Sequence, residues 1–160
     1  MKTLKRGDRL TIGIISDTHG TLPEKAIEAL AGVQVILHAG DIGSEEVIGQ
    51  LERIAPVIAV RGNMDGGPWC QDRAITEAVE LGGIGVYLLH DIHHLDLDPA
   101  AGGFSLVVSG HTHRAVAIEQ NGVLFLNPGS AAYPRHGSPP GIARVTIENG
   151  KLTHRLVSLE

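Results

Sequence analysis

The sequence predicts an α/β protein in which two sheets pack face to face with helices outside. Two observations support this fold class. The first 61 residues alternate between apolar, strand-like runs and short amphipathic segments, an order that implies a parallel sheet with right-handed crossovers. After about residue 70, strand-like runs flank short glycine-containing turns, which is typical of antiparallel hairpins. A parallel half followed by an antiparallel half favours an α/β sandwich.

The first third of the chain contains three buried strands and two helices in this prediction. Apolar, β-branched runs predict the strands at Leu10–Ser16, Val33–His38 and Pro56–Arg61. Proline near the start and apolar residues at helical spacing predict a helix over Pro23–Ala31. A second helix is expected after Ser44, a suitable N-cap, with an apolar stripe formed by Val47, Ile48, Leu51 and Ile54.

Three hairpins and one further strand are expected in the rest of the chain. Turns at Gly82-Gly83, Gln120-Asn121-Gly122 and Asn149-Gly150 separate the hairpin strands, and Asn-Gly is the strongest short hairpin signal. The strands are Ala74–Leu81 with Ile84–Leu89, Ala115–Glu119 with Val123–Asn127, and Ile142–Glu148 with Leu152–Val157. Phe104–Ser109 is the additional strand.

Length and composition bound the function. A chain of 160 residues corresponds to one domain, 1–160, and 42% hydrophobic residues with 19% charged ones are typical of a folded protein. The net charge of −5 argues against tight binding of polynucleotides, which requires excess cationic side chains. One cysteine, Cys70, excludes an intramolecular disulfide and fits a cytoplasmic location, and no apolar run is long enough for a membrane span. The nine histidines are a surplus that points to metal.

Polar residues follow the three predicted parallel strands where each ends. Asp17 and His19 come after the first strand, Asp41 after the second, and Asn63 with Asp65 after the third. Each motif alone is also an ordinary polar turn. Together they lie at the carboxyl edge of a parallel sheet, where open α/β sheets bind their ligands.

Imidazoles follow two strands of the second half. His90 ends one strand, and Gly110-His111-Thr112-His113 ends another, with both histidines of that motif on one side of an extended chain. Carboxylate, amide and imidazole without thiolate suit Mn²⁺, Fe or Zn²⁺ better than a structural zinc site. Seven candidates exceed the needs of one ion and match two ions that share a carboxylate. They are Asp17, His19, Asp41, Asn63, His90, His111 and His113.

In this order, the motifs resemble those of the calcineurin-like metallophosphoesterases. The blocks are Asp17-x-His19, Gly40-Asp41, Gly62-Asn63-x-Asp65, His90 and Gly110-His111-Thr112-His113. The short chain, Asn127-Pro128-Gly129-Ser130 and Pro134-Arg135 resemble the small bacterial and archaeal phosphodiesterase branch. The resemblance implies a four-layer α/β/β/α sandwich with two metal ions, most often Mn²⁺, although Ni²⁺, Zn²⁺, Fe or Co²⁺ could serve. It assigns Asp17, His19 and His113 to the first ion, Asn63, His90 and His111 to the second, and Asp41 to both.

Two positions depart from the family pattern. The family often has a histidine directly after the metal-binding asparagine, where it can protonate the leaving group, and this position is Met64 here. Glycine commonly follows the ligand at His90, whereas Asp91 follows it here. The nearby His93 and His94 are either proton donors or part of a hydrophilic loop.

The expected reaction is hydrolysis of phosphodiesters by a bridging hydroxide activated by two metal ions, with Asp41, Asn63 and His90 as catalytic residues. Asp65 or His38 could orient a ligand, and Arg135 could bind a phosphate oxygen or be a solvated loop residue. A small phosphodiester or nucleotide-like substrate is expected, without a membrane partner, and apolar sheet edges would allow a homo-oligomer. The alternatives are a non-catalytic, metal-binding scaffold for protein–protein interaction and a phosphomonoesterase of the same fold.

Overall fold

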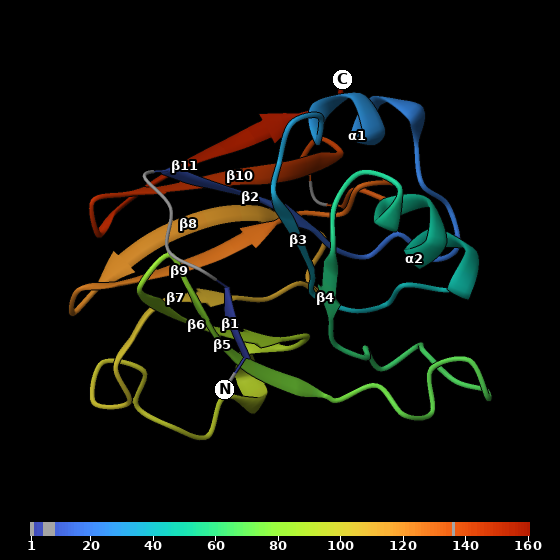
Figure 1. Cartoon of the computed structure of the whole chain (residues 1–160). Helices are drawn as coiled ribbons and strands as arrows, with labels where there is room; N and C mark the ends of the chain where they lie inside the picture. Colours follow the sequence, from blue (N-terminus) through green and yellow to red (C-terminus); the bar gives the residue numbers. More distant parts are fainter. Residues whose placement is uncertain (1, 5–8, 136) are drawn as a thin grey trace.

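A computed structural model describes residues 2–4, 9–135 and 137–160, which form two sheets packed face to face (Figure 1). The six-stranded sheet has the order β1-β5-β6-β7-β9-β8, and the five-stranded sheet has the order β11-β10-β2-β3-β4. Both sheets contain parallel and antiparallel pairs. The predicted α/β sandwich of two mixed sheets is confirmed.

The five-stranded sheet combines the two ends of the sequence. Its strands are β2 (Arg9–Ile15), β3 (Val35–His38), β4 (Val57–Ala59), β10 (Gly141–Glu148) and β11 (Lys151–Ser158). The first three are parallel, as predicted. β10 lies antiparallel to β2, with Val145 opposite Ile12, and β11 completes the edge. The last hairpin therefore joins the parallel strands, and the change of pattern near residue 70 is not the boundary between the sheets.

The six-stranded sheet contains the other two hairpins. Its strands are β1 (Lys2–Leu4), β5 (Thr76–Leu81), β6 (Ile84–Leu89), β7 (Phe104–Val108), β8 (Ala115–Gln120) and β9 (Val123–Pro128). β7 lies parallel between β6 and β9, so its carboxyl end meets theirs. β1, which the sequence did not predict, pairs in parallel with β5. A strand of three residues is too short for a periodic signal.

The helices are short and depend on packing. They are α1 (Glu24–Ala29), α2 (Glu45–Glu52) and the 3-10 helix η1 (Ile92–His94). α1 is shorter than predicted because the chain leaves the helix before Gly32, whose φ is 82°. Ser44 occupies the N-cap position of α2 in an extended conformation, but its side chain makes no capping hydrogen bond. Isolated helices of this length are unstable in water, so burial against the sheet must hold them.

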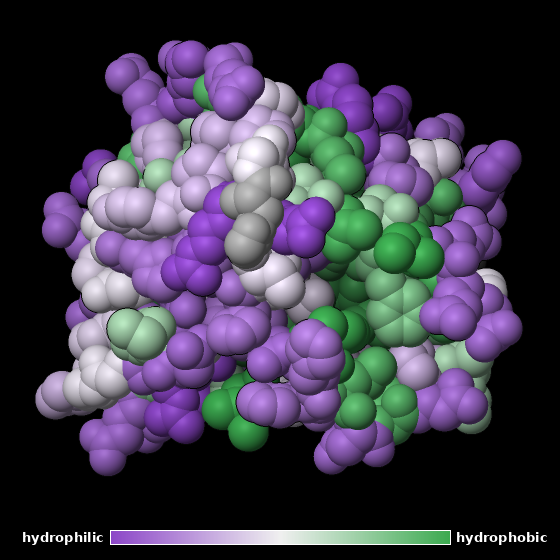
Figure 2. Space-filling view, turned by 180° about the vertical axis from the view of Figure 1, so that it is seen from behind, coloured by the Kyte–Doolittle hydropathy of each residue, from purple (hydrophilic) through white to green (hydrophobic). Residues whose placement is uncertain are grey.

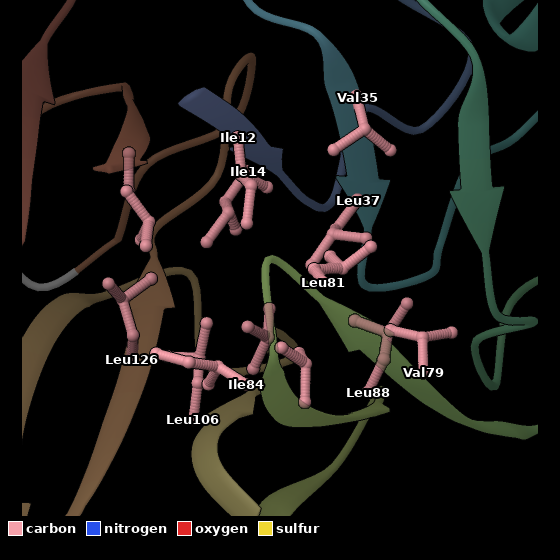
Figure 3. Close-up of a cluster of buried hydrophobic side chains, with 14 of the residues drawn as sticks. Ile12, Ile14, Val35, Leu37, Val79, Leu81, Ile84, Leu88, Leu106 and Leu126 are labelled. Carbon is pink, nitrogen blue, oxygen red and sulfur yellow. The ribbon is translucent and has the colours of Figure 1, made fainter. Parts of the chain in front are cut away.

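The main core fills the space between the sheets (Figure 3). Ile12 and Ile14 of β2 face Leu106 and Leu126 of the other sheet, and all four are almost fully buried. Each such side chain contributes about 1.5–3 kcal/mol relative to an exposed one. Apolar residues on the inner faces of both sheets therefore fix the position of the polar loops that follow the strands.

The two outer faces of the sandwich differ. α1 and α2 pack on the five-stranded sheet over a second apolar cluster that includes Ile15, Leu30 and Leu51. Over the six-stranded sheet, η1 and the loop after it contact a smaller cluster around Tyr87 and Val107. Among the described residues, this outer layer is a 3-10 turn and a loop instead of a longer helix. The reverse side of the molecule is largely hydrophilic with one apolar area (Figure 2). None of the described helices is long and apolar enough to cross a membrane.

Candidate metal centre

The predicted ligands follow strands of both sheets and meet at one end of the sandwich. Backbone hydrogen bonds join the loops that carry them. The N–H groups of Asp17 and His19 donate to the carbonyls of Gly40 and Asp41, at 3.0 and 2.9 Å. The N–H of Gly110 donates to the carbonyl of His90 at 2.9 Å. The loops are therefore cross-linked independently of any ion.

Five of the seven predicted ligands have a left-handed backbone. The φ angles are 54° at Asp17, 46° at His19, 53° at Asp41, 72° at His111 and 61° at His113. Among the described residues, the other non-glycine residues with positive φ are two asparagines in hairpin turns. This conformation costs an L-residue roughly 1–2 kcal/mol, and such strain gathers at functional sites. Backbone strain thus marks the same residues that the sequence motifs marked.

One group of potential ligand atoms consists of Asp17, His19 and His113. Asp17 Oδ1 lies 3.3 Å from His113 Nε2 and 3.7 Å from His19 Nε2. The two Nε2 atoms are 3.2 Å apart. Donor atoms at these separations converge on a single point, which is the arrangement that a metal ion requires.

The second group joins Asp17 to Asp41 and His90. His90 Nε2 lies 3.2 Å from Asp41 Oδ2 and 3.9 Å from Asp17 Oδ1. Asp41 Oδ2 also lies 3.8 Å from His19 Nε2, so this carboxylate stands between the two groups. The position fits the bridging role that the family resemblance assigned to Asp41.

Hydrogen bonds to the other ring nitrogens fix the tautomers of two histidines. His90 Nδ1 lies 2.7 Å from the carbonyl oxygen of Ala39, and His113 Nδ1 lies 2.5 Å from that of Tyr133. A carbonyl oxygen only accepts hydrogen bonds, so each Nδ1 must carry the proton. In the neutral rings, Nε2 keeps its lone pair and points into the site, as in metal-binding histidines.

Two buried atoms of the site have no hydrogen-bond partner among the described residues. They are Asp17 Oδ1 and His90 Nε2. A buried polar atom without a partner costs about 1–3 kcal/mol of folding stability. Two such atoms in one site therefore indicate that the site binds a ligand. Both atoms are electron-pair donors, and together with the fixed tautomers they fit a cation.

The charges of the site support this conclusion. Burial alone would raise the pKa of Asp41, but His90 and the N–H of Met64 outweigh it and hold that pKa below its ordinary value. Burial alone would lower the pKa of His90, but the carboxylates of Asp41 and Asp17 outweigh it and raise that pKa. A metal ion and a proton compete for the same nitrogen of His90, so metal binding should weaken in acid.

Asn63 and His111 lie beside these two groups. Asn63 is exposed, and His111 retains 41% of its side-chain exposure, with its ring 5.2 Å from that of His90. Both line a groove that reaches His90. The structure therefore collects five predicted ligands into two tight groups and places the other two on the adjoining wall.

Asp65 joins the loops that carry Asp41 and Asn63. Its carboxylate accepts hydrogen bonds from the N–H groups of Ile42, Gly43 and Gly62, at 3.1, 3.0 and 2.9 Å. A side chain at Gly62 would meet Asp41 Oδ1 at 2.2 Å, so only glycine permits this approach. Asp65 acts on the position of Asp41 through the backbone.

His38 has a similar supporting role and is neutral. Its Nε2 lies 3.0 Å from Thr18 Oγ1, and its Nδ1 accepts from the N–H of Gly40 at 3.1 Å. Thr18 donates its own proton to the carbonyl of Ile42, so Nε2 of His38 must be the donor to Thr18. Burial, reinforced by the nearby His90, lowers the pKa of His38 to about 3. The ring connects the loop of Asp17 with the loop of Asp41.

Two supporting residues, Asn127 at the end of β9 and Ser130 just after it, belong to a motif that the sequence analysis used for the family resemblance without giving them a role. Asn127 Nδ2 donates to the carbonyl of Gly110 at 2.8 Å, and Ser130 Oγ donates to the carbonyl of Asp17 at 2.7 Å. Both hold ligand-bearing loops from behind. The signal was available, because polar residues directly after a β-strand had already identified the other loops.

The role of Arg135 in binding a phosphate oxygen stays a prediction. Its side chain is exposed and forms no hydrogen bond or ion pair with the described residues. Asp91, the other unusual position, accepts a hydrogen bond from the N–H of His93 at 3.0 Å and begins η1. Its second oxygen lies 3.7 Å from Nε2 of His111. Asp91 thus connects the 3-10 turn with a predicted ligand.

Comparison with known proteins agrees with this geometry. The calcineurin-like phosphoesterase superfamily domain matches residues 10–150. A probable metallophosphoesterase of Methanothermobacter thermautotrophicus is 32% identical, covering 92% of each chain. A phosphodiesterase of Methanocaldococcus jannaschii is 34% identical over 94% of this chain and 100% of its own. Vacuolar Protein Sorting 29 of Cryptosporidium parvum superimposes with a TM-score of 0.77, covering 94% of this chain and 98% of its own. With 23% identity, that last likeness concerns the fold alone.

Proposed function

Because the chain belongs to the calcineurin-like phosphoesterase superfamily, we propose that it is a metal-dependent phosphodiesterase. The relatives named above are a metallophosphoesterase and a phosphodiesterase. The observation that carries the proposal is the pair of buried, unpartnered donor atoms, Asp17 Oδ1 and His90 Nε2. A bound cation would give both atoms a partner.

Two divalent ions are proposed, most readily Mn²⁺. Asp17, His19 and His113 hold the first, Asn63, His90 and His111 hold the second, and Asp41 contacts both. When bound, two such ions supply a nucleophilic hydroxide from water and neutralise the phosphate. The described residues contribute three things: a rigid set of donors, fixed histidine tautomers and an open groove beside Asn63.

The leaving group needs a proton, and Met64 cannot supply one. His94 lines the same groove as Asn63 and His111, with its Nε2 3.9 Å from Asp91 Oδ2. His93 is equally exposed but is not among the residues that line the groove. We therefore assign the proton donation to His94. As a water oxygen forms the new P–O bond and loses a proton to solvent, the bond to the leaving oxygen breaks. That oxygen takes a proton from His94, which solvent then restores.

Hydrolysis of an aryl phosphodiester tests the function. Purified protein with added Mn²⁺ should release nitrophenol from bis(4-nitrophenyl) phosphate, and Asp41→Ala should be inactive. A protein that shows no hydrolysis with Mn²⁺, Ni²⁺, Zn²⁺ or Co²⁺, whatever its metal content, would be the non-catalytic scaffold. Relative rates on aryl monoesters and diesters decide between the two esterase activities.

A cytoplasmic location and a homo-oligomer stay predictions. Two edge strands carry exposed apolar side chains that a second copy could cover, namely Val116 and Ile118 on β8 and Leu156 on β11. Sedimentation at micromolar concentration would measure the oligomeric state.

A further inference from the structure

A groove of about 560 Å³ opens beside the predicted metal ligands. Asn63, His90 and His111 are among the residues that line it. Its volume falls within the range of about 300–1,000 Å³ that is common for small-molecule sites. A phosphate held by the ligands would leave most of this space to an organic substituent of the ester.

Three apolar or aromatic residues also line the groove, namely Ile75, Tyr87 and Leu89. Tyr87 and Leu89, on the same side of β6, are nearly buried, so Ile75, which directly precedes the neighbouring strand β5, supplies the exposed apolar surface. Ile75 keeps 61% of its surface exposed, although isoleucine is usually buried. An apolar group seated in the groove would remove this surface from water, which is favourable by about 25 cal/mol per Å².

The charged residues of the groove disfavour an anionic substituent. Asp91 and Asp96 line it, whereas Arg61 is the one guanidinium among the described lining residues. Asp65 adds a further carboxylate, already bonded to backbone N–H groups. The lining therefore holds three carboxylates against one guanidinium.

We infer that this groove binds the leaving group of the phosphodiester and selects a group that carries an apolar ring or chain without negative charge. The inference rests on the proposed function, and His94 in the same lining connects the two. A leaving group that itself bears phosphates would meet Asp91 and Asp96 and be rejected.

Kinetics with two matched esters test the selection. The first is methyl 4-nitrophenyl phosphate, and the second carries a carboxylate on the nitrophenyl ring. The wild-type protein should show a KM about fivefold higher for the charged ester, the effect of about 1 kcal/mol of like-charge repulsion. Ile75→Lys should remove or reverse that preference. Ile118→Lys is the control, because Ile118 is similarly exposed, at 56%, on β8 outside the groove.

A binding measurement separates this inference from the proposed function. In NMR spectra of the Zn²⁺-loaded protein, phenylphosphonate should shift the signals of Ile75 and Tyr87 and leave those of Ile118 in place. If no ester is hydrolysed but these signals shift, the groove assignment stands and the phosphodiesterase proposal fails. If esters are hydrolysed while Ile75→Lys changes neither KM and the signals do not move, the groove assignment is overturned.

Discussion

The two ends of the sandwich use the left-handed backbone for different purposes. At the end with the predicted ligands, this conformation belongs to aspartates and histidines, with Asp41 at φ 53°. At the other end, it belongs to the hairpin residues Asn121 and Asn149, also at φ 53°, each followed by glycine. The same backbone conformation therefore occurs at predicted metal ligands at one end and at turn residues at the other.

The two ends of the sandwich differ in how well their residues suit a left-handed backbone. Asparagine and glycine adopt positive φ at little cost, so the hairpin turns contain residues suited to their backbone. Histidine carries a Cβ penalty at positive φ that glycine lacks, so we infer that His19 and His113 occupy these positions for their side chains. Hydrogen bonds between the loops, such as that from the N–H of His19 to the carbonyl of Asp41, offset the strain. Four predictions compare residues at the end with the predicted ligands with matched controls elsewhere in the chain.

The largest effect is expected from exchanging Asp and Asn at equal φ. Asp41→Asn keeps the shape and the backbone preference but removes the negative charge between the two groups of ligand atoms. Because a bound metal supplies several kcal/mol of stabilisation, hydrolysis should fall about 10³-fold, with loss of bound metal. Asn149→Asp makes the reverse exchange in a turn and should leave kcat/KM unchanged. Equal losses in both variants would contradict the contrast.

The next effect concerns two adjacent histidines on η1. His94→Gln should lower the rate about 10²-fold for esters with poor, alkyl leaving groups, because general acid catalysis matters most for them. The rate for nitrophenyl esters should change little. His93→Gln, at 81% side-chain exposure against 82% for His94, is the control and should behave as the wild type. A leaving-group dependence identical to that of the wild type in His94→Gln would exclude His94 as the donor.

The third effect is a loss of folding stability in acid, caused by His38 beside the predicted ligands. His38 is neutral in the fold with its pKa lowered to about 3, whereas the unfolded chain regains the ordinary value of 6.5. Below this value the unfolded state binds a proton that the native state does not, so stability is lost as the pH falls from about 6.5 towards 3. The slope reaches about 1.4 kcal/mol per pH unit.

Urea unfolding across this pH range measures the effect. His38→Gln should flatten the curve relative to the wild type. His154→Gln, on the exposed edge strand β11, should follow the wild type because that side chain is exposed in both states. A wild-type curve that stays level between pH 6.5 and 4 would disprove the assignment of a buried, neutral His38.

The smallest effect isolates the strain itself. His19→Ala and His19→Gly both remove the imidazole, but only glycine accepts φ 46° freely, so the glycine variant should be about 1 kcal/mol more stable. Asn149→Gly should exceed Asn149→Ala in stability by a similar amount. Only the His19 pair should lose metal and activity. Thermal unfolding of the four variants provides the measurement, and equal stability within each pair would remove the strain argument.

Most of the ligand end could be predicted from local sequence. Polar residues after apolar runs identified Asp17, Asp41 and His90, because parallel strands bring their carboxyl ends to one edge. The left-handed backbone of His19 and His113 could not be predicted, since it depends on hydrogen bonds between loops distant in sequence. Nothing local distinguished His94 from His93 either, because both belong to the same short turn.

The arrangement of strands into sheets was harder to predict from the sequence. Periodicity identifies a strand but not its neighbour, so the pairing of β10 with β2 had no signal in the sequence. β1 has three residues, too few to show a period. The thin outer layer over β6 and β7 depends on a 3-10 helix of three residues, which is also too short to show a periodic pattern in the sequence.

The strands at the two ends of the chain complete different sheets, and this topology affects how the protein folds. β1 completes the sheet formed mainly by the middle of the sequence, and β10 with β11 completes the sheet that begins at β2. Ile12 must find Val145 across nearly the whole chain, which makes the contact order high and folding slow compared with a chain of local hairpins. We expect the three hairpins to form early and the strand that leads to Asp17 to be enclosed late. A ribosome-bound chain that still lacks its last hairpin would therefore present β2 as an open edge, available for pairing with other chains.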